Sequence, residues 1–285
     1  MLIDLQLHST YSDGYLTPTQ LAEFIAKKGI KVASLTDHNT VSGLYEFRQA
    51  CKKLKIKPIT GLELYVKLKH KKFNLLWYNF DDKRPELHDL LRDSQIRRRN
   101  KMRKILLKLE SLGFKININK ILDKYNHYIP LNHVIDDILL ASHNRSKMKN
   151  ELESNYLQEG EIINKYFKNN KIGILYESYI DFNRVLELRK KIGGILILNH
   201  PAKHGYIKEK LWEDLSKLGL DGVEILSPHH SFNAIMCIQH MAKKFNLITT
   251  GGSDFHRFEN DLISCSAQYF KINNEYLNGV EKIIK

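Results

Sequence analysis

The first 80 residues alternate between strand-like and helix-like patterns of hydrophobic positions. Ile3, Leu5 and Leu7 alternate with polar residues, which predicts a strand with one buried face. A helix is expected from Thr17, because Thr17 and Gln20 have the spacing of a capping box and Pro18 suits the first helical turn. The same patterns predict a helix over 43–54 and strands over 32–36, 58–66 and 73–80.

The middle of the chain has a different character. Residues 85–191 carry mostly helical signals and are rich in Lys, Asn and Arg. Alternation then resumes, with strands expected over 195–198, 222–226 and 247–250 and helices over 211–218 and 234–245. We therefore expect an α/β domain made of residues 1–84 and 192–285, interrupted by a mainly helical insert, residues 85–191. Repeated βα units indicate a largely parallel sheet, open or closed into a barrel.

Composition narrows the class of protein. The chain has 285 residues, of which 42% are hydrophobic and 27% charged, and this excludes collagen, low-complexity disorder and a small disulfide scaffold. The net charge of +13 favours anionic partners such as nucleotides, nucleic acid or phosphate esters, although lysine-rich surfaces also serve solubility. The densest basic block, Arg97–Lys104, is either a contact for a polyanionic substrate or a solvated helix face.

Localisation signals are lacking in the sequence. The N-terminus has no basic segment followed by a long apolar one, and no apolar run approaches the ~18 residues that span a bilayer. The three cysteines form no C-x-x-C pair. We therefore expect a cytoplasmic protein without a membrane association, and the sequence implies no obligate protein partner.

Polar side chains able to bind metal follow nearly every predicted strand. In a parallel α/β sheet or barrel, the carboxyl ends of the strands form one face, so these residues should converge there. Gln6 with His8, and Asp254 with His256, have the i, i+2 spacing that places both side chains on one face of a strand. The full set is Gln6, His8, Asp13, Asp37, His38, Glu63, His200, Glu224, Asp254 and His256.

The donor types in this set point to divalent cations. Imidazoles and carboxylates without thiolates suit Mn, Zn or Fe, with Mg possible where carboxylates dominate. Taken singly, a histidine at a strand end can be a hydrogen-bonding residue, Asp13-Gly14 can be a turn, and Asp254 can cap a helix. The repetition from strand to strand favours a metal cluster, since bound cations would relieve the repulsion between converging carboxylates.

Several of these segments resemble the motifs of the PHP (polymerase and histidinol phosphatase) domain. They are residues 4–9 (DLQLHS), 12–14 (SDG), 36–43 (TDHNTVSG), 61–63 (GLE), 199–201 (NHP) and 250–256 (TGGSDFH). Chain length and the helical insert most resemble the stand-alone bacterial subfamily. The resemblance implies a distorted (β/α)7 TIM-like barrel and a phosphoesterase that acts on nucleoside 3′,5′-bisphosphates, on nucleotides or on RNA 5′ ends.

The resemblance also implies two or three divalent ions, with up to three binding sites. One site would use Gln6, His8, Glu63 and Asp254, a second Glu63, Asn74 and His200, and a third Asp13, His38 and His256. Asp37 would support these ligands from behind. His133 in the insert and His230 match family histidines near the substrate.

This chain departs from the family pattern at three positions. Gln6 and Asn74 stand where the family has histidine, and Leu131 stands where it has a phosphate-binding arginine, before Asn132 and His133. Amide oxygens are weaker donors than imidazole for zinc-like ions. Arg257 or Lys203 could replace the missing arginine.

The leading hypothesis is therefore a metal-dependent phosphoesterase in which a metal-bound hydroxide attacks the phosphorus of a nucleotide or short RNA. Two alternatives remain open from the sequence. One is a degenerate PHP module that binds a nucleotide or nucleic acid with little turnover, which Gln6, Asn74 and Leu131 favour. The other is a histidinol-phosphate phosphatase.

Overall fold

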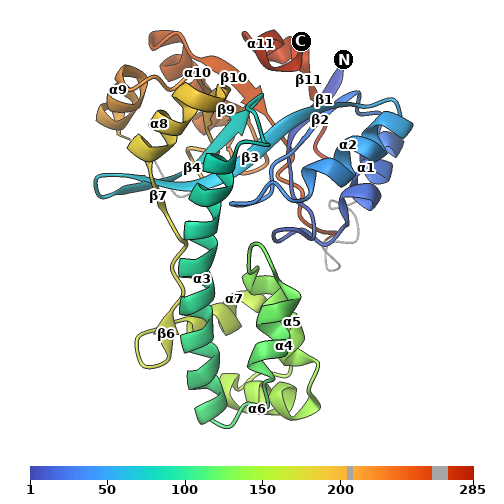
Figure 1. Ribbon diagram of the computed structural model, residues 1–285, viewed down its shortest axis with the longest axis vertical. Coiled ribbons are helices and arrows are strands. Elements are labelled where there is room, and N and C mark those ends of the chain that lie inside the picture. The colour runs from blue at the N-terminus through green and yellow to red at the C-terminus, as the bar shows by residue number, and fades with distance from the viewer. Residues whose placement is uncertain (204–207, 259–268) are drawn as a thin grey trace. The chain divides into compact units, whose positions relative to one another are not determined.

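The computed structural model describes residues 1–203, 208–258 and 269–285 (Figure 1). Contacts divide the chain into two compact units. The first comprises residues 1–88 and 179–285, and the second comprises residues 89–178.

A nine-stranded sheet forms the centre of the first unit. Two short strands, β7 (Ile180–Asp181) and β11 (Ile272–Asn273), add to β3 and β1. The other seven form the wall in the spatial order β10, β9, β8, β4, β3, β2, β1. Their bounds are β1 Leu2–Leu7, β2 Val32–Leu35, β3 Lys57–Leu68, β4 Lys71–Tyr78, β8 Ile195–Leu198, β9 Gly222–Leu226 and β10 Ile248–Gly251.

The sheet closes on itself through the segment that follows β10. The Asp254 N–H donates to the Gln6 carbonyl at 3.1 Å, and the His8 N–H donates to the Phe255 carbonyl at 3.1 Å. Gly252 allows this approach, because a Cβ there would lie 2.6 Å from the Gln6 nitrogen. Within the wall, β1–β2–β3 and β8–β9–β10 are parallel and β4 is antiparallel to both neighbours. The predicted α/β fold, a distorted TIM-like barrel, is confirmed.

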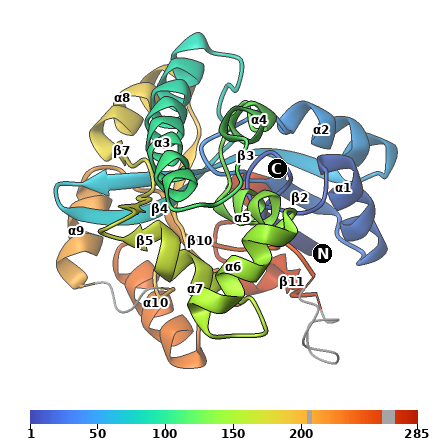
Figure 2. The ribbon, with the colours of Figure 1, turned by 90° about the horizontal axis from the view of Figure 1, so that it is seen from below.

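Helices cover the outside of the barrel. In both views α1 (Pro18–Lys27) and α2 (Leu44–Lys53) lie together on one side (Figures 1 and 2). The other side carries α8 (Phe182–Ile192), α9 (Glu209–Lys217) and α10 (Phe232–Lys244). The predicted capping box of α1 is present, with Thr17 and Gln20 bonded reciprocally. The chain ends in the 3-10 turn Asn274–Tyr276 and α11 (Glu281–Ile284).

The second unit is mainly helical and has its own hydrophobic core, which includes Leu106, Leu122, Val134, Met148 and Phe167. It contains most of α3 (Pro85–Ser111), then α4 (Ile118–Lys124), α5 (Leu131–Leu139), α6 (Ser142–Leu152), α7 (Glu159–Ile162), a π-helical turn (Ile163–Phe167) and the strand pair β5 (Lys168–Asn169) and β6 (Gly173–Ile174).

The end of this unit differs from the predicted insert boundary at residue 191. Residues from Tyr179 onward group with the barrel, because Ile180 pairs with Val66 of β3 and α8 packs on the same strand. A strand of two residues is too short to give a periodic signal in the sequence. The predicted domain boundaries at 84/85 and 191/192 stay a prediction. The compact units defined by contacts meet at 88/89 and 178/179.

The basic block at Arg97–Lys104 forms contacts within the second unit. Arg98 is buried, donates to the Ile129 carbonyl at 2.6 Å, pairs with Glu177 and lies over the Tyr128 ring. Arg97 donates to the Ser178 hydroxyl at 3.1 Å. Arg99 reaches the Leu122 carbonyl and Asp123, and Arg103 reaches Asn119. These arginines tie α3 to its neighbours, so neither interpretation from the sequence describes them fully.

Among helices of the described ranges, none is both long enough and apolar enough to cross a membrane.

Candidate metal centre

The end of β1 and the loop after it supply the first three side chains of the site. Gln6 and His8 lie on the same face, and both are fully buried. The chain then turns tightly, with the Ser12 and Gly14 N–H groups donating to the Ser9 carbonyl at 2.9 and 3.0 Å. Gly14 is required there, since a Cβ would lie 2.2 Å from the His8 carbonyl oxygen. The turn carries Asp13 back to His8, with Oδ1 3.6 Å from Nδ1.

Asp37, directly after β2, holds this turn in place. Its carboxylate accepts hydrogen bonds from the Ser9 N–H at 2.8 Å, the Ser9 hydroxyl at 2.7 Å and the Ser12 hydroxyl at 2.6 Å. All of these contacts go to the loop that presents Asp13. Asp37 thus has the supporting position that the resemblance implied.

His38 and Glu63 come from β2 and β3, which are adjacent strands. His38 forms an isolated parallel bridge with Glu63, and its Nδ1 lies 3.8 Å from Glu63 Oε1. Its Nε2 lies 3.5 Å from Asp13 Oδ2. The His38 ring stacks on Tyr65, with 4.5 Å between the centroids. His38 thereby stands between two carboxylates.

Asn74 and His200 approach Glu63 from the other side. The parallel strands end at one edge of the barrel, the rim. Because β4 is antiparallel, its beginning rather than its end lies at the rim, and this brings Asn74 Nδ2 within 2.6 Å of Glu63 Oε1. His200 follows β8, with Nε2 3.5 Å from the same oxygen. The His200 backbone has a φ of 21°, and its N–H donates to Glu224 at 3.2 Å.

Asp254 and His256 complete the cluster after β10. Asp254 has a left-handed φ of 50°, and its Oδ1 lies 3.1 Å from His8 Nε2 and 2.8 Å from Gln6 Nε2. His256 Nδ1 donates to the Asp254 carbonyl at 2.6 Å, so Nε2 is left facing Asp13 Oδ1 at 3.3 Å. The structure thus brings together the nine predicted ligands, Gln6, His8, Asp13, His38, Glu63, Asn74, His200, Asp254 and His256.

Two overlapping groups of these residues have the spacing of a metal site. The potential ligand atoms of His8, Asp13, His38 and His256 lie within 4.8 Å of one another, and so do those of His8, Glu63 and Asp254. His8 supplies the test of fit. It is fully buried, and among the described residues neither ring nitrogen makes a hydrogen bond of ordinary geometry, although carboxylate oxygens lie 3.1 and 3.2 Å from Nε2. A buried histidine with a purely structural role normally forms hydrogen bonds, so the cluster fits a divalent ion.

Neighbouring imidazoles oppose the effect of burial on the pKa of the carboxylates in the cluster. Burial alone would raise the pKa of Asp13, but His38 and His256 hold the pKa of this carboxyl well below its ordinary value. Burial likewise opposes ionisation of Glu63 and Asp254, but neighbouring imidazoles hold both pKa values well below the ordinary range. Glu224 differs, because burial and the nearby Asp254 raise its pKa well above the ordinary value. Burial therefore favours the neutral form of the Glu224 carboxyl.

The sequence did not predict two contacts with the Asp254 carboxylate. His229 Nε2 lies 2.6 Å from Asp254 Oδ2, and Lys203 Nζ lies 2.9 Å from the same oxygen. The ring nitrogens of His230, the predicted substrate residue next to His229, face the backbone, and its role in binding substrate stays a prediction. His230 Nδ1 donates to the Ile225 carbonyl at 2.9 Å, and its Nε2 faces the Ala202 N–H at 3.5 Å, so both nitrogens face backbone groups. Of two adjacent histidines after a strand, the sequence gives no signal for which one faces inward.

The remaining predicted substrate residues are Arg257 and His133. Arg257 is exposed next to His256, with its guanidinium carbon 5.5 Å from the Tyr15 ring centroid. His133 lies on α5 in the second unit, half-buried, with its ring 6.2 Å from that of Tyr125. A role for either residue in binding substrate stays a prediction.

Imidazoles and carboxylates gathered at the carboxyl ends of barrel strands define an α/β barrel with a metal-binding rim. The sequence profile of the PHP domain matches residues 4–196, and the chain belongs to this family. The resemblance inferred from the motifs is thereby confirmed.

Curated relatives cover almost the whole chain. A 5′-3′ exoribonuclease of Haemophilus influenzae is 29% identical over 257 residues, which are 89% of each chain. A 3′,5′-nucleoside bisphosphate phosphatase of Chromobacterium violaceum is 25% identical over 89% of this chain and 87% of its own. A solved structure from Bifidobacterium adolescentis shares the fold, with a TM-score of 0.79, 18% identity, and coverage of 99% of this chain and 94% of that one.

Proposed function

We propose that this protein is a metal-dependent phosphoesterase that hydrolyses phosphate esters of nucleotides or of RNA 5′ ends. The convergence of His8, Asp13, His38, Glu63, His200, Asp254 and His256 in one cluster carries the proposal. The names of the relatives support it, since one acts on RNA and another on nucleoside bisphosphates.

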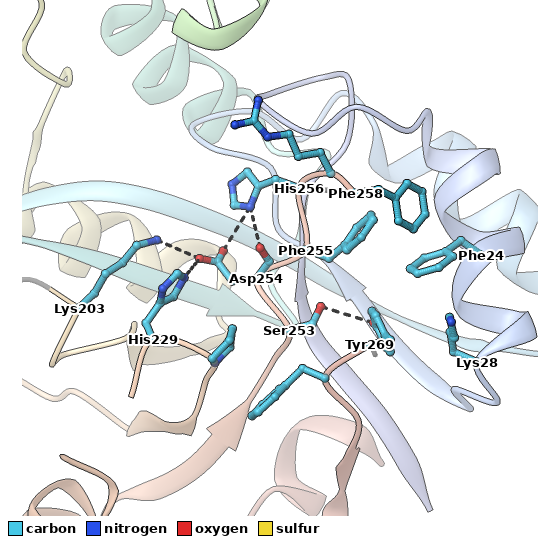
Figure 3. Close-up of a pocket in the computed structure, with 13 residues that line it drawn as sticks. Phe24, Lys28, Lys203, His229, Ser253, Asp254, Phe255, His256, Phe258 and Tyr269 are labelled. Carbon is cyan, nitrogen blue, oxygen red and sulfur yellow. Dashed lines mark hydrogen bonds and ion pairs between the residues drawn. The ribbon is translucent and has the colours of Figure 1, made fainter. Parts of the chain in front are cut away.

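A cavity of about 680 Å³ beside the cluster suits such a substrate. Asp254, His256, His229 and Lys203 line one part of it, and a group of aromatic rings lines another (Figure 3). In that group Phe24 stacks on Phe255 at 4.8 Å, and Phe258 lies edge-on to Phe24 at 5.0 Å. Cationic side chains can bind a phosphate and aromatic faces can hold a base.

The chain's own residues would orient the substrate and the ions. A bound divalent ion would lower the pKa of a water molecule and neutralise charge on the phosphate. Asp13, His38 and His256 would hold the ion on one side, and Asp37 keeps the Asp13 loop in position. Arg257 lines the cavity, and its positive charge would bind phosphate oxygens in place of the arginine that Leu131 replaces.

The alternatives from the sequence receive less support. The named relatives act on nucleotides or RNA rather than on histidinol phosphate. The degenerate-module hypothesis rests on Gln6, Asn74 and Leu131, but the seven residues named above as carrying the proposal keep the donor types expected of the family.

The test is phosphate release by the purified protein with added Mn²⁺, measured with three substrates at equal concentration. These are adenosine 3′,5′-bisphosphate, a 5′-phosphorylated RNA oligonucleotide and histidinol phosphate. We expect turnover of one or both of the first two, loss of turnover on chelation and recovery when Mn²⁺ returns. Turnover that survives exhaustive chelation, or that is confined to histidinol phosphate, would contradict the proposal.

A further inference from the structure

We propose that Lys203, together with the amides of Gln6 and Asn74, takes the place of a divalent ion at the Glu63–Asp254 side of the cluster. A single divalent ion is then held tightly, by His8, Asp13, His38 and His256, while no substrate is bound. This inference rests on the proposed metal dependence and concerns how many ions this chain holds.

The Asp254 carboxylate is surrounded by nitrogen donors. Its Oδ1 lies 2.8 Å from Gln6 Nε2 and 3.1 Å from His8 Nε2. Its Oδ2 lies 2.9 Å from Lys203 Nζ and 2.6 Å from His229 Nε2, as the dashed lines in Figure 3 show for Lys203 and His229. A side chain that is only 2% exposed is therefore neutralised by protein groups on both oxygens.

Glu63 is satisfied in a similar way. Asn74 Nδ2 lies 2.6 Å from Oε1, and Gln6 Nε2 lies 3.1 Å from Oε2. The single Gln6 amide group thus bridges Glu63 and Asp254. A histidine at either amide position would present a lone pair to an ion, whereas an amide N–H binds the carboxylate directly.

His8 can serve only one side of the cluster as a ligand, because a neutral imidazole has one nitrogen with a lone pair and one with a proton. With the proton on Nε2, that nitrogen faces the Glu63 and Asp254 oxygens at 3.2 and 3.1 Å, without a hydrogen bond of ordinary geometry, and the Nδ1 lone pair faces Asp13. Carboxylates behind metal-binding histidines fix the tautomer in this way. His8 then joins Asp13, His38 and His256, the four-residue group whose ligand atoms lie within 4.8 Å.

The position of Lys203 leads to the same count. Its ammonium lies 2.9 Å from Asp254 Oδ2, and the side chains of Lys203 and Asp254 are 29% and 2% exposed. A second cation on this side would have to approach or displace that ammonium in a site with little access to water, which is costly until a phosphate dianion arrives.

The experiment counts bound Mn²⁺ by elemental analysis after dialysis of the whole protein, and measures affinity by calorimetric titration. We expect one tightly held ion in the wild type and two in a Gln6→His/Lys203→Met double variant. Lys203→Met alone should tighten the second ion about tenfold or more, since one positive charge is removed. Lys203→Arg, which keeps the charge, should bind like the wild type.

Lys28→Met is the matched control, because Lys28 lines the same cavity and its Nζ lies over the Phe24 ring, 5.4 Å from the centroid. It should leave the count at one. Two or more tightly held ions in the wild type would overturn the inference even if the variants did not fold, and so would equal second-ion affinities in Lys203→Met and Lys28→Met. Phosphate release tests the proposed function separately, since an enzyme with several tight ions could still be active.

Discussion

The rim of the barrel and the middle of α3 are both rich in charged side chains, but they use them differently. At the rim, acids and imidazoles come from segments far apart in the sequence, and within the described residues neither ring nitrogen of the buried His8 makes a hydrogen bond of ordinary geometry. On α3, four arginines come from one helix, and each binds a group of its own unit. A cluster assembled from many strands that leaves buried polar atoms unsatisfied indicates a ligand. A run of like charges on one helix often forms hydrogen bonds and ion pairs with neighbouring parts of the same unit.

The largest effect should come from the rim. Asp13→Asn keeps the shape of the side chain but removes the charge that faces His38 and His256. We expect kcat/KM for phosphate release to fall by at least about a hundredfold, together with loss of bound Mn²⁺. Asp123→Asn, at a carboxylate that pairs with Arg99, is the control and should keep full activity. Wild-type rates in Asp13→Asn would show that Asp13 is not a ligand.

The α3 block should affect stability instead. Arg98→Ala removes a buried guanidinium and leaves the Ile129 carbonyl and Glu177 without it. We expect a loss of about 3 kcal/mol in the free energy of unfolding, measured by urea denaturation. Arg99→Ala is the matched control, since the side chains of Arg99 and Asp123 are 32% and 71% exposed, and it should cost less than about 1 kcal/mol. Equal losses in the two variants would contradict the structural role of Arg98.

The smallest expected effect concerns two buried glutamates of the rim, whose pKa values are shifted in opposite directions. Neighbouring imidazoles hold the pKa of Glu63 below its ordinary value against the effect of burial, whereas burial raises the pKa of Glu224. A raised pKa means that the stability contributed by protonated Glu224 is complete below its ordinary pKa and is lost as the pH rises through the folded-state value. Glu224→Gln should therefore change stability by less than about 0.5 kcal/mol at pH 5, and it should lose less stability than the wild type between pH 5 and pH 8. Parallel pH profiles for the two proteins would show that Glu224 is ionised.

Much of the barrel could be predicted because its signals are local. The alternation in β1 and the capping box of α1 lie within a few residues of one another. The positions of the ligands followed from a rule of topology, that the carboxyl ends of parallel strands meet. Asn74 obeys this rule only through the reversal of β4, which places the start of the strand at the rim.

Other features depended on packing that the sequence does not encode locally. The inward orientation of His229 rather than His230 is fixed by hydrogen bonds to Asp254 and Ile225. The contact between Lys203 and Asp254 joins residues 51 positions apart. The role of Arg98 depends on Ile129 and Glu177, which reach it only once the second unit is folded.

The peptide that closes the barrel also delivers Asp254 and His256. Its two hydrogen bonds to β1 lie beside the side chains that would bind an ion. An ion held there would cross-link the first strand of the barrel to the segment after the last strand, at the point where the sheet closes. Occupancy of the site and the mechanical integrity of the barrel are therefore coupled by the same few residues.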